Sequence, residues 1–318
     1  MFKWLNPKLS EVIEMYLAVK TALSPRTVKL TKLAWDYLVM FASDVRVDRF
    51  KDVAGYQAYC AKTVSPTSVR MYRKSIAPLF TWCVERRYIK KNPFEDIRPP
   101  RPVKKNPRVY SPKEFRRIFD ACPSQYWKAV VLIAYTTGAR KSAIENLVKT
   151  DIDFESGVIK IQDKYDSEPD KWEWHPKDRE DRTLPLVKPA ADIILELIYS
   201  SPSPYFLLKP ARYFHLLELK KMGLMSSEMK LYPFSNFDRT FRKIKRKAGI
   251  KGKFHDFRSS FASEMLNGGC SLVEVRDLLG HSSIQTTEVY LGSNSELVKK
   301  ARAVSASLLE VNASLEGN

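Results

Sequence analysis

A proline-dense segment near residue 100 places the strongest constraint on how this chain can fold. Prolines stand at positions 93, 99, 100, 102 and 107, basic residues alternate with them, and no glycine lies between them. Such a segment forms an extended and fairly stiff connection, because proline cannot continue a helix or donate to a sheet. We therefore expect a first domain over residues 1–97, a linker over residues 98–108 and a second domain over residues 109–318. A chain of 318 residues is also long enough for two domains.

Positive charge is concentrated in the first third of the chain. The whole chain holds 54 Lys and Arg against 36 Asp and Glu, a net charge of +18. Residues 1–108 hold 22 Lys and Arg against 9 Asp and Glu, so +13 of the excess lies there and +5 in the remainder. Excess positive charge on this scale favours a polyanionic partner, and nucleic acid is the first candidate.

The composition argues against several classes of protein. No run of about 18 apolar residues is present, which argues against a transmembrane helix. The start of the chain lacks the apolar core and the cleavage site of a signal peptide. The four cysteines are far apart and form no Cys-x-x-Cys pair, which disfavours a zinc site or a disulfide framework. We expect a cytoplasmic, DNA-associated protein with no membrane partner.

The first domain has the pattern of a bundle of helices. Apolar residues recur at helical spacing, and Ser65-Pro66 has the serine N-cap and first-turn proline of a helix start. The helix that follows carries an apolar stripe and a basic stripe, and Pro78 is expected to kink it. The basic stripe is either a solvated face or a phosphate-binding face, and the charge of the region favours phosphate binding. The candidate DNA contacts on this helix and in the linker are Arg70, Arg73, Lys74, Lys104 and Lys105.

The second domain mixes helices with a few short strands. The apolar run 127–135 predicts a buried helix. Residues 152–161 predict a hairpin with a Ser-Gly turn, and residues 182–186 predict another strand. The later part of the domain is mostly helical in pattern. The segment 201–232 is hard to assign and is interpreted as a candidate insertion.

Three short clusters hold residue types that carry chemistry. The first is Thr137-Gly138-Ala139-Arg140, with an arginine directly after a glycine turn. The second is His255-Asp256-Phe257-Arg258, whose histidine and arginine are neighbours on one face of a helix. The third is Leu278-Leu279-Gly280-His281, and Tyr290 follows it nine positions after the histidine. Each of these residues alone is more often a structural or surface group, so the specificity lies in the set and its order.

With these clusters in this order, the sequence resembles the tyrosine recombinase (phage integrase) family. That family carries arginine, lysine, His-x-x-Arg, histidine or tryptophan, and tyrosine in succession. The segments Ser24-Pro25-Arg26-Thr27 and Lys91-Asn92-Pro93 also resemble its core-binding domain. The resemblance implies a mainly α, multidomain chain with a helical, SAM-like core-binding domain. It further implies an α-rich catalytic domain with a small antiparallel β-sheet, known as the DNA breaking-rejoining fold.

The lysine of the family lies on a β-turn shortly before a strand of the form Arg-x-x-Pro-Leu. The strand that begins at Arg182 fits this form and puts Lys177 at the usual distance before it. The hairpin is unusually long in this chain, so Lys171 and Lys164 remain alternatives.

A second departure concerns the residue three positions after Arg140. The family commonly has an acidic residue there, whereas this chain has Ala143, and Glu145 is nearby but out of register. This departure questions one contact that supports the active site and leaves the arginine itself unaffected.

The resemblance implies that Tyr290 attacks a DNA phosphate and forms a 3′-phosphotyrosyl intermediate. Arg140 and Arg258 would hold the non-bridging oxygens, on which negative charge increases during attack. Guanidinium groups suit this role because they stay charged at any working pH and bind oxygens with a planar fork.

Three further residues complete the implied site. His255 is the candidate for proton transfer from the tyrosine, because imidazole titrates near neutral pH. Lys177 is the candidate general acid for the leaving 5′-oxygen, and His281 would donate a hydrogen bond to a non-bridging oxygen. No metal or other cofactor is expected, and no ATP, because the covalent link keeps the energy of the phosphodiester bond. Consistent with this, the sequence has no phosphate-binding loop of the Walker type.

The end of the chain has the pattern of an amphipathic helix. Apolar residues recur at spacings of 4, 3, 4 and 3 from Leu297 to Val311, which predicts a helix over about residues 295–312. Packing within the same chain is one interpretation. The resemblance favours docking on a neighbouring copy, in a dimer on one double-stranded recombination site and a tetramer on two.

Two other functions share part of this pattern. A type IB topoisomerase would relax DNA with the same chemistry, and a non-catalytic DNA-binding protein would need only the basic residues. The full set of catalytic residue types and the segment 278–283 favour a site-specific recombinase over both. The short segment before the first helix favours a simple Xer-like or transposon-type recombinase. The sequence leaves open the target site and the choice among chromosome dimer resolution, phage integration and transposition.

Overall fold

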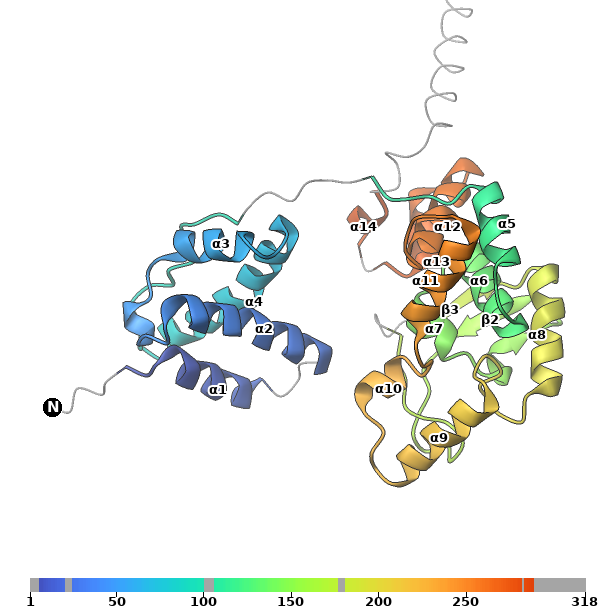
Figure 1. Cartoon of the computed structure of the whole chain (residues 1–318), viewed down its shortest axis with the longest axis horizontal. Helices are drawn as coiled ribbons and strands as arrows, with labels where there is room; N and C mark the ends of the chain where they lie inside the picture. The colour runs from blue at the N-terminus through green and yellow to red at the C-terminus, as the bar shows by residue number, and fades with distance from the viewer. Residues whose placement is uncertain (1–5, 21–24, 100–105, 177–180, 282, 289–318) are drawn as a thin grey trace, which may run out of the picture. The chain divides into compact units, whose positions relative to one another are not determined.

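The computed structural model describes residues 6–20, 25–99, 106–176, 181–281 and 283–288. The chain divides into two compact units, Met1–Lys105 and Asn106–Asn318 (Figure 1). The division lies inside the expected linker over residues 98–108. The elements confirm the expectation of a mainly α chain with a small antiparallel sheet.

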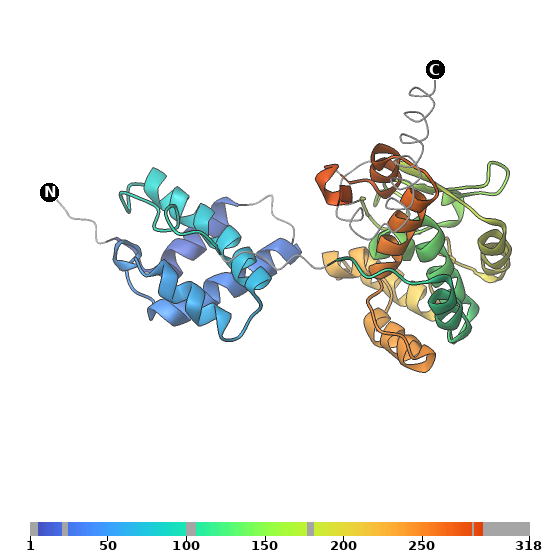
Figure 2. The ribbon, with the colours of Figure 1, turned by 90° about the horizontal axis from the view of Figure 1, so that it is seen from above.

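The first unit consists of helices around an aromatic core. Its described helices are α1 (Leu9–Val19), α2 (Pro25–Ala42), α3 (Val53–Ala61) and α4 (Pro66–Glu85), with a 3-10 turn η1 (Val47–Arg49). Figure 2 shows these helices from above. The rings of Phe50, Phe80 and Phe94 contact one another in the core, and Phe94 is almost fully buried. The segment that follows α4 is therefore packed into the core of this unit.

Two sequence signals of α4 can be located in the structure, one at its start and one in its middle. The Ser65 hydroxyl accepts a hydrogen bond from the Ser68 backbone N–H at 3.3 Å, which confirms the predicted cap. Pro78 lies inside the helix, which continues for another two turns beyond it. The buried Asn92 side chain donates to the Ala77 carbonyl at 3.0 Å and fastens the following segment to α4.

The second unit is built around the helix α6 (Gln125–Thr137), whose residues from 129 to 134 are all buried, as the apolar run predicts. Helices α8 (Lys188–Ser200) and α12 (Asp256–Asn267) pack on α6. The other described helices are α5 (Pro112–Asp120), α7 (Lys141–Glu145), η2 (Lys149–Asp151), α9 (Pro210–Lys221), α10 (Ser227–Leu231), α11 (Phe237–Ala248), α13 (Leu272–Leu279) and α14 (Gln285–Glu288).

A three-stranded antiparallel sheet forms in the order β1–β2–β3. The strands are β1 (Ile152–Asp153), β2 (Val158–Ile161) and β3 (Arg182–Pro185), which confirms the predicted hairpin and the later strand. Arg182, the first residue of β3, lies opposite Ile161 at the end of β2. A single bridge between Lys164 and Trp174 continues the pairing beyond the sheet. This bridge closes residues 165–173 into a separate loop.

The long hairpin and the segment 201–232 pack against each other, and we call residues 165–174 and 201–232 together the accessory lobe. The Trp172 ring is fully buried and stacks on Tyr205, with ring centroids 3.9 Å apart. The Lys220 amino group donates to the backbone carbonyls of Asp166 at 3.2 Å and Glu168 at 2.8 Å. The two stretches that depart from the expected pattern therefore form one packed structure with its own small core.

The described part of the chain has no helix long and apolar enough to cross a membrane. Among the same residues, no group of three or more His, Cys, Asp or Glu side chains is arranged to hold a metal ion. Cys60, Cys83 and Cys122 are free and buried.

Candidate active site

A glycine turn at the end of α6 lies two residues before Arg140. Gly138 adopts the left-handed conformation with φ of +62° and ends the helix. A side chain at this position would clash, because a Cβ atom would lie 2.7 Å from Phe261 and 2.9 Å from Leu279. The turn therefore requires glycine for both its conformation and its close packing. Arg140 follows as the N-cap residue of α7.

The guanidinium of Arg258 joins the ends of two other helices. It lies in the first turn of α12 and is only 3% exposed. Its Nη1 donates to the Gly138 carbonyl at 2.9 Å, and its Nη2 donates to the Leu279 carbonyl at 2.6 Å. Hydrogen bonds to a charged donor are strong in a buried setting. They bind the ends of α6 and α13 to the start of α12.

The third cluster, residues 278–281, spans the end of α13. Gly280 is left-handed with φ of +61°, and its carbonyl accepts a hydrogen bond from Arg140 Nη2 at 2.9 Å. The next residue is His281, whose Nδ1 lies 2.9 Å from the hydroxyl oxygen of the buried Thr287. The structure therefore brings together Arg140, Arg258 and His281, although more than 100 residues separate the first from the others in sequence.

His255 lies directly before α12, with its side chain exposed at the surface. The pKa of His255 is lowered from its ordinary value, first because surrounding protein atoms displace part of its water. The positive charges of Arg258 and Arg140 lower it further. This shift favours the neutral imidazole, the state in which it can accept a proton.

Two of the three candidate lysines, Lys164 and Lys171, lie within the described residues. The Lys164 amino group is buried, forms an ion pair with Asp151 at 3.0 Å and lies over the Trp174 ring. Lys171 pairs with Glu168 inside the accessory lobe. Both amino groups are thus engaged in holding the long hairpin together. Two predicted residues, Lys177 and Tyr290, lie outside the described residues, as do Lys104, Lys105 and the predicted helix 295–312.

The acidic residue nearest to Arg140 in sequence, Glu145, has its side chain buried inside the protein. Ala143 is buried, and the fully buried Glu145 accepts a hydrogen bond from the Phe234 backbone N–H at 3.0 Å. The Lys141 amino group lies 3.8 Å from the other carboxylate oxygen. Burial raises the pKa of Glu145 to about 8. Glu145 therefore ties α7 to the chain that follows the accessory lobe.

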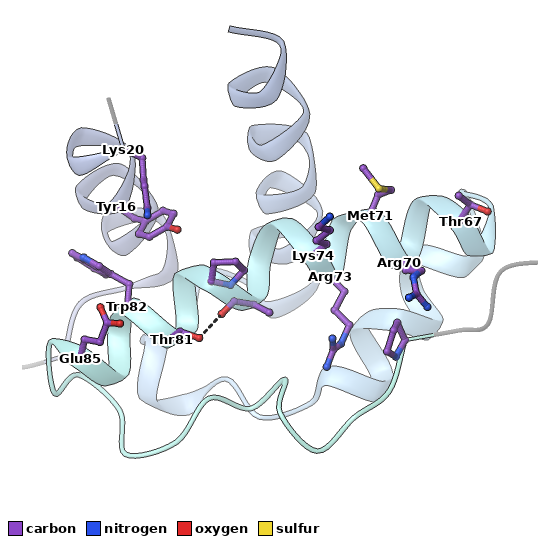
Figure 3. Close-up of a pocket in the computed structure, with 13 residues that line it drawn as sticks. Tyr16, Lys20, Thr67, Arg70, Met71, Arg73, Lys74, Thr81, Trp82 and Glu85 are labelled. Atoms are coloured by element: carbon purple, nitrogen blue, oxygen red, sulfur yellow. Dashed lines mark hydrogen bonds between the residues drawn. The ribbon is translucent and has the colours of Figure 1, made fainter. Parts of the chain in front are cut away.

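The basic stripe of α4 divides into two kinds of residue. Arg73 Nη2 donates to the Ile97 carbonyl at 2.7 Å and to the Phe94 carbonyl, so this guanidinium is used within the first unit. Arg70 and Lys74 are exposed and line an open groove of about 910 Å³ beside α1 and α4 (Figure 3). Of the three predicted contacts on α4, Arg70 and Lys74 retain the exposure that phosphate binding needs.

Sequence reasoning missed a second basic surface, on α11. Phe237, Phe241 and Ile244 bury one face of this helix. The opposite face is exposed and carries Arg239, Arg242, Lys243, Arg246 and Lys247. The net charge of the second domain is close to balanced, so an average over the domain does not reveal the basic residues gathered on α11. The spacing of the basic residues by three and four positions was the available signal.

The chain is similar to known proteins over most of its length. The Phage integrase family model matches residues 108–296. Tyrosine recombinase XerC of Chlorobaculum parvum is 27% identical over 91% of this chain and 89% of its own. Tyrosine recombinase XerA of Pyrococcus furiosus is 29% identical over 68% of each chain.

Solved structures are similar in fold. A lambda integrase dimer bound to a COC' core site has a TM-score of 0.67 at 14% identity, with 89% of this chain and 77% of that chain covered. The Tn1549 transposon integrase with circular intermediate DNA has a TM-score of 0.65 at 16% identity, with 90% and 95% covered. These similarities confirm the expected fold.

The buried Glu145 should make stability depend on pH. The unfolded chain releases this proton near the ordinary value of 4.5, whereas the folded chain holds it up to about pH 8. Unfolding therefore releases a proton in this window, and the free energy of unfolding falls as the pH rises. Glu145→Gln removes the titration, so its stability relative to wild type should increase from pH 5 to pH 8.5. Urea unfolding at several pH values measures this, and a constant difference would contradict the assignment.

Proposed function

The chain belongs to the phage integrase family and is a tyrosine-type site-specific recombinase, and we propose that it cuts and rejoins DNA through a covalent tyrosine intermediate. The observation that carries this proposal is the convergence of three clusters at the end of α13. Arg258 binds the Leu279 carbonyl and Arg140 binds the Gly280 carbonyl, directly before His281. Two guanidiniums and an imidazole thus gather beside one short segment.

This set of groups suits the transition state of attack on a phosphodiester. Negative charge increases on the non-bridging oxygens as the attacking oxygen approaches. We propose that Arg140 and Arg258 hold these oxygens, while His281 donates a hydrogen bond to one of them. Because the arginines are already held by backbone carbonyls, little rearrangement is needed during the reaction, and this preorganisation favours the transition state.

Proton transfer completes the proposed mechanism. Tyr290 is the proposed nucleophile, and a tyrosine needs help to lose its proton because its ordinary pKa is about 10. The lowered pKa of His255 favours the neutral imidazole, which is able to take that proton. Lys177 is the proposed donor to the leaving 5′-oxygen. The internal contacts of Lys164 and Lys171 favour it over the two alternatives.

The energy of the cut strand is kept in the bond between tyrosine and DNA. Religation needs only a 5′-hydroxyl that attacks this bond, and a hydroxyl from a second duplex gives recombination. In this scheme the arginines supply the positive charge that a metal ion supplies in metal-dependent nucleases. No ATP is consumed. We therefore propose a reaction without metal or ATP.

Two basic surfaces are the proposed contacts with double-stranded DNA. The first is formed by Arg70 and Lys74 beside the groove of the first unit (Figure 3). The second is the exposed face of α11. Contacts of this kind bind phosphates without regard to base sequence and fix the position of the protein on the duplex.

We propose a dimer on one recombination site and a tetramer on two. The similar lambda integrase is a dimer on its core site. Strand exchange between two duplexes requires subunits on both. The apolar pattern from Leu297 to Val311 supplies a segment suited to docking on a neighbouring copy.

Covalent capture from randomly nicked genomic DNA of the source organism tests the chemistry. Wild type should yield protein-linked DNA whose cut positions converge on one sequence. Tyr290→Phe should yield none, and Arg258→Ala should lower the rate of formation by about 10²–10³-fold. Sequencing of the recovered ends maps the site. Absence of wild-type adducts would contradict the proposal, and scattered cut positions would indicate DNA relaxation instead.

The basic face of α11 should contribute to the salt dependence of DNA binding. Replacing Arg242, Lys243 and Arg246 with alanine should reduce the slope of log affinity against log salt by about 2 to 3, because each lost phosphate contact removes about 0.9. The measurement is fluorescence anisotropy of labelled duplex DNA at several salt concentrations.

A control variant separates this contact from loss of charge in general. Arg116, Lys188 and Lys221 are exposed and each pairs with a neighbouring carboxylate. Their triple alanine variant removes the same charge and should leave the slope almost unchanged. Equal losses in both variants would show that α11 makes no specific contact.

Removing the end of the chain tests its role in assembly. A variant that ends at Gly292 should bind a single site with nearly wild-type affinity but fail to exchange strands between two sites. Gel-shift and strand-exchange assays measure the two properties. Normal recombination by this variant would contradict docking between copies, and loss of stability would favour packing within one chain.

A further inference from the structure

A third guanidinium reaches the segment that Arg140 and Arg258 bind. Arg182 Nη1 donates to the Leu279 carbonyl at 2.6 Å. The same oxygen accepts the hydrogen bond from Arg258 Nη2, also at 2.6 Å. A carbonyl oxygen has two lone pairs and can accept both bonds. The proposed catalytic arginine and Arg182 therefore share one acceptor.

Gly280, the residue after Leu279, leaves room for the Arg182 side chain because it has no Cβ atom. A Cβ atom on Gly280 would lie 1.5 Å from Arg182 Nη1 and 2.4 Å from Arg182 Cζ. The guanidinium thus packs directly against the glycine backbone, in space that any other residue would fill. Gly280 also has φ of +61°, so both its conformation and its neighbour favour glycine.

The end of α13 provides a physical reason for this convergence. The last carbonyls of a helix have no partner within the helix and carry its partial negative charge. Leu279 is the last residue of α13, and Gly280 follows it. Three arginines, at the N-cap of α7, in β3 and in α12, supply donors to these two carbonyls. Arg182 is the one that belongs to the sheet, because it begins β3.

We propose that Arg182 is a positioning residue that holds segment 279–281 so that Arg258, Arg140 and His281 meet the reacting phosphate. This inference rests on the proposed function of that site. Arg182 acts through the Leu279 carbonyl and the Gly280 backbone, and it ties them to the sheet. Without it, the Leu279 carbonyl loses one of its two arginine donors among the described residues, and the end of α13 loses its hydrogen bond to β3.

Single-turnover cleavage of the mapped site tests this role. Arg182→Ala should slow formation of the covalent complex on the order of 10²-fold, because small displacements of a reacting group have effects of this size. DNA affinity should stay within about threefold of wild type, since a positioning residue does not contact the duplex. Arg116→Ala, which removes an exposed arginine paired with Asp120, should match wild type in both measurements.

A double-mutant cycle identifies the residue through which Arg182 acts. In an Arg258→Ala background, Arg182→Ala should cause a smaller loss than in wild type, because one of the three groups that it positions is gone. Full additivity of the two losses would overturn the proposal, as would a loss of DNA affinity that accounts for the slower reaction. The latter result would make Arg182 a direct DNA contact.

Two further variants keep the test valid if Arg182→Ala unfolds. Arg182→Lys keeps a positive charge and a donor but lacks the planar group that packs on Gly280, so it should recover part of the rate. Gly280→Ala introduces the clash from the other side and should slow cleavage less in an Arg182→Lys background, which lacks the guanidinium, than in wild type. Equal effects of Gly280→Ala in both backgrounds would overturn the proposal.

A substrate with one non-bridging oxygen replaced by a methyl group separates positioning from general stability. This phosphate is neutral, so placement of the arginines matters less, and the rate loss of Arg182→Ala should shrink. An unchanged loss would overturn the proposal. Wild-type adduct formation in the same experiment, absent in Tyr290→Phe, shows that the proposed function itself holds. Failure of that function is thereby distinguished from failure of the inference.

Discussion

The buried guanidinium of Arg258 is the interaction on which the second unit depends. A buried charge costs several kcal/mol unless hydrogen bonds replace its hydration. The Gly138 and Leu279 carbonyls do this at 2.9 and 2.6 Å. Because these carbonyls end α6 and α13 while Arg258 begins α12, satisfying one side chain fixes three helices relative to one another. The same carbonyl cluster then receives Arg140 and Arg182. Arg258 and Arg140 therefore serve both structural hydrogen bonding and the proposed binding of phosphate.

The accessory lobe connects two parts of the chain that depart from the family pattern, the long hairpin and the helix α7, which contains Ala143. The Trp172 Nε1–H of the long hairpin donates to the Asn146 side chain at 2.9 Å, directly after α7. Glu145 of α7 binds the backbone at Phe234, just beyond the lobe. The helix that Arg140 caps is therefore supported by this lobe, in a chain where Ala143 occupies the usual acidic position. The long hairpin contributes to the support of α7 as well as to the sheet.

Much of the fold and of the candidate site followed from local patterns. The cap at Ser65, the buried α6 and the antiparallel hairpin are encoded in short windows of sequence. Arg73 differs, because its partners are backbone carbonyls about 20 residues later, which no local pattern reveals. The basic face of α11 was readable from spacing but was concealed by averaging charge over the whole domain. Arg182 appeared only as the start of a strand, since its acceptor lies 97 residues away.

The sequence by itself determined the division at the proline-dense segment, the helical character and the order of the arginine, histidine and tyrosine motifs. These features are local, because proline geometry, capping and periodicity act over a few residues. The tertiary structure alone decided which basic residues are free to meet DNA, which hairpin lysines are engaged internally, and where three arginines converge. Those outcomes depend on which backbone carbonyls remain without partners after the helices pack, and that depends on the whole fold.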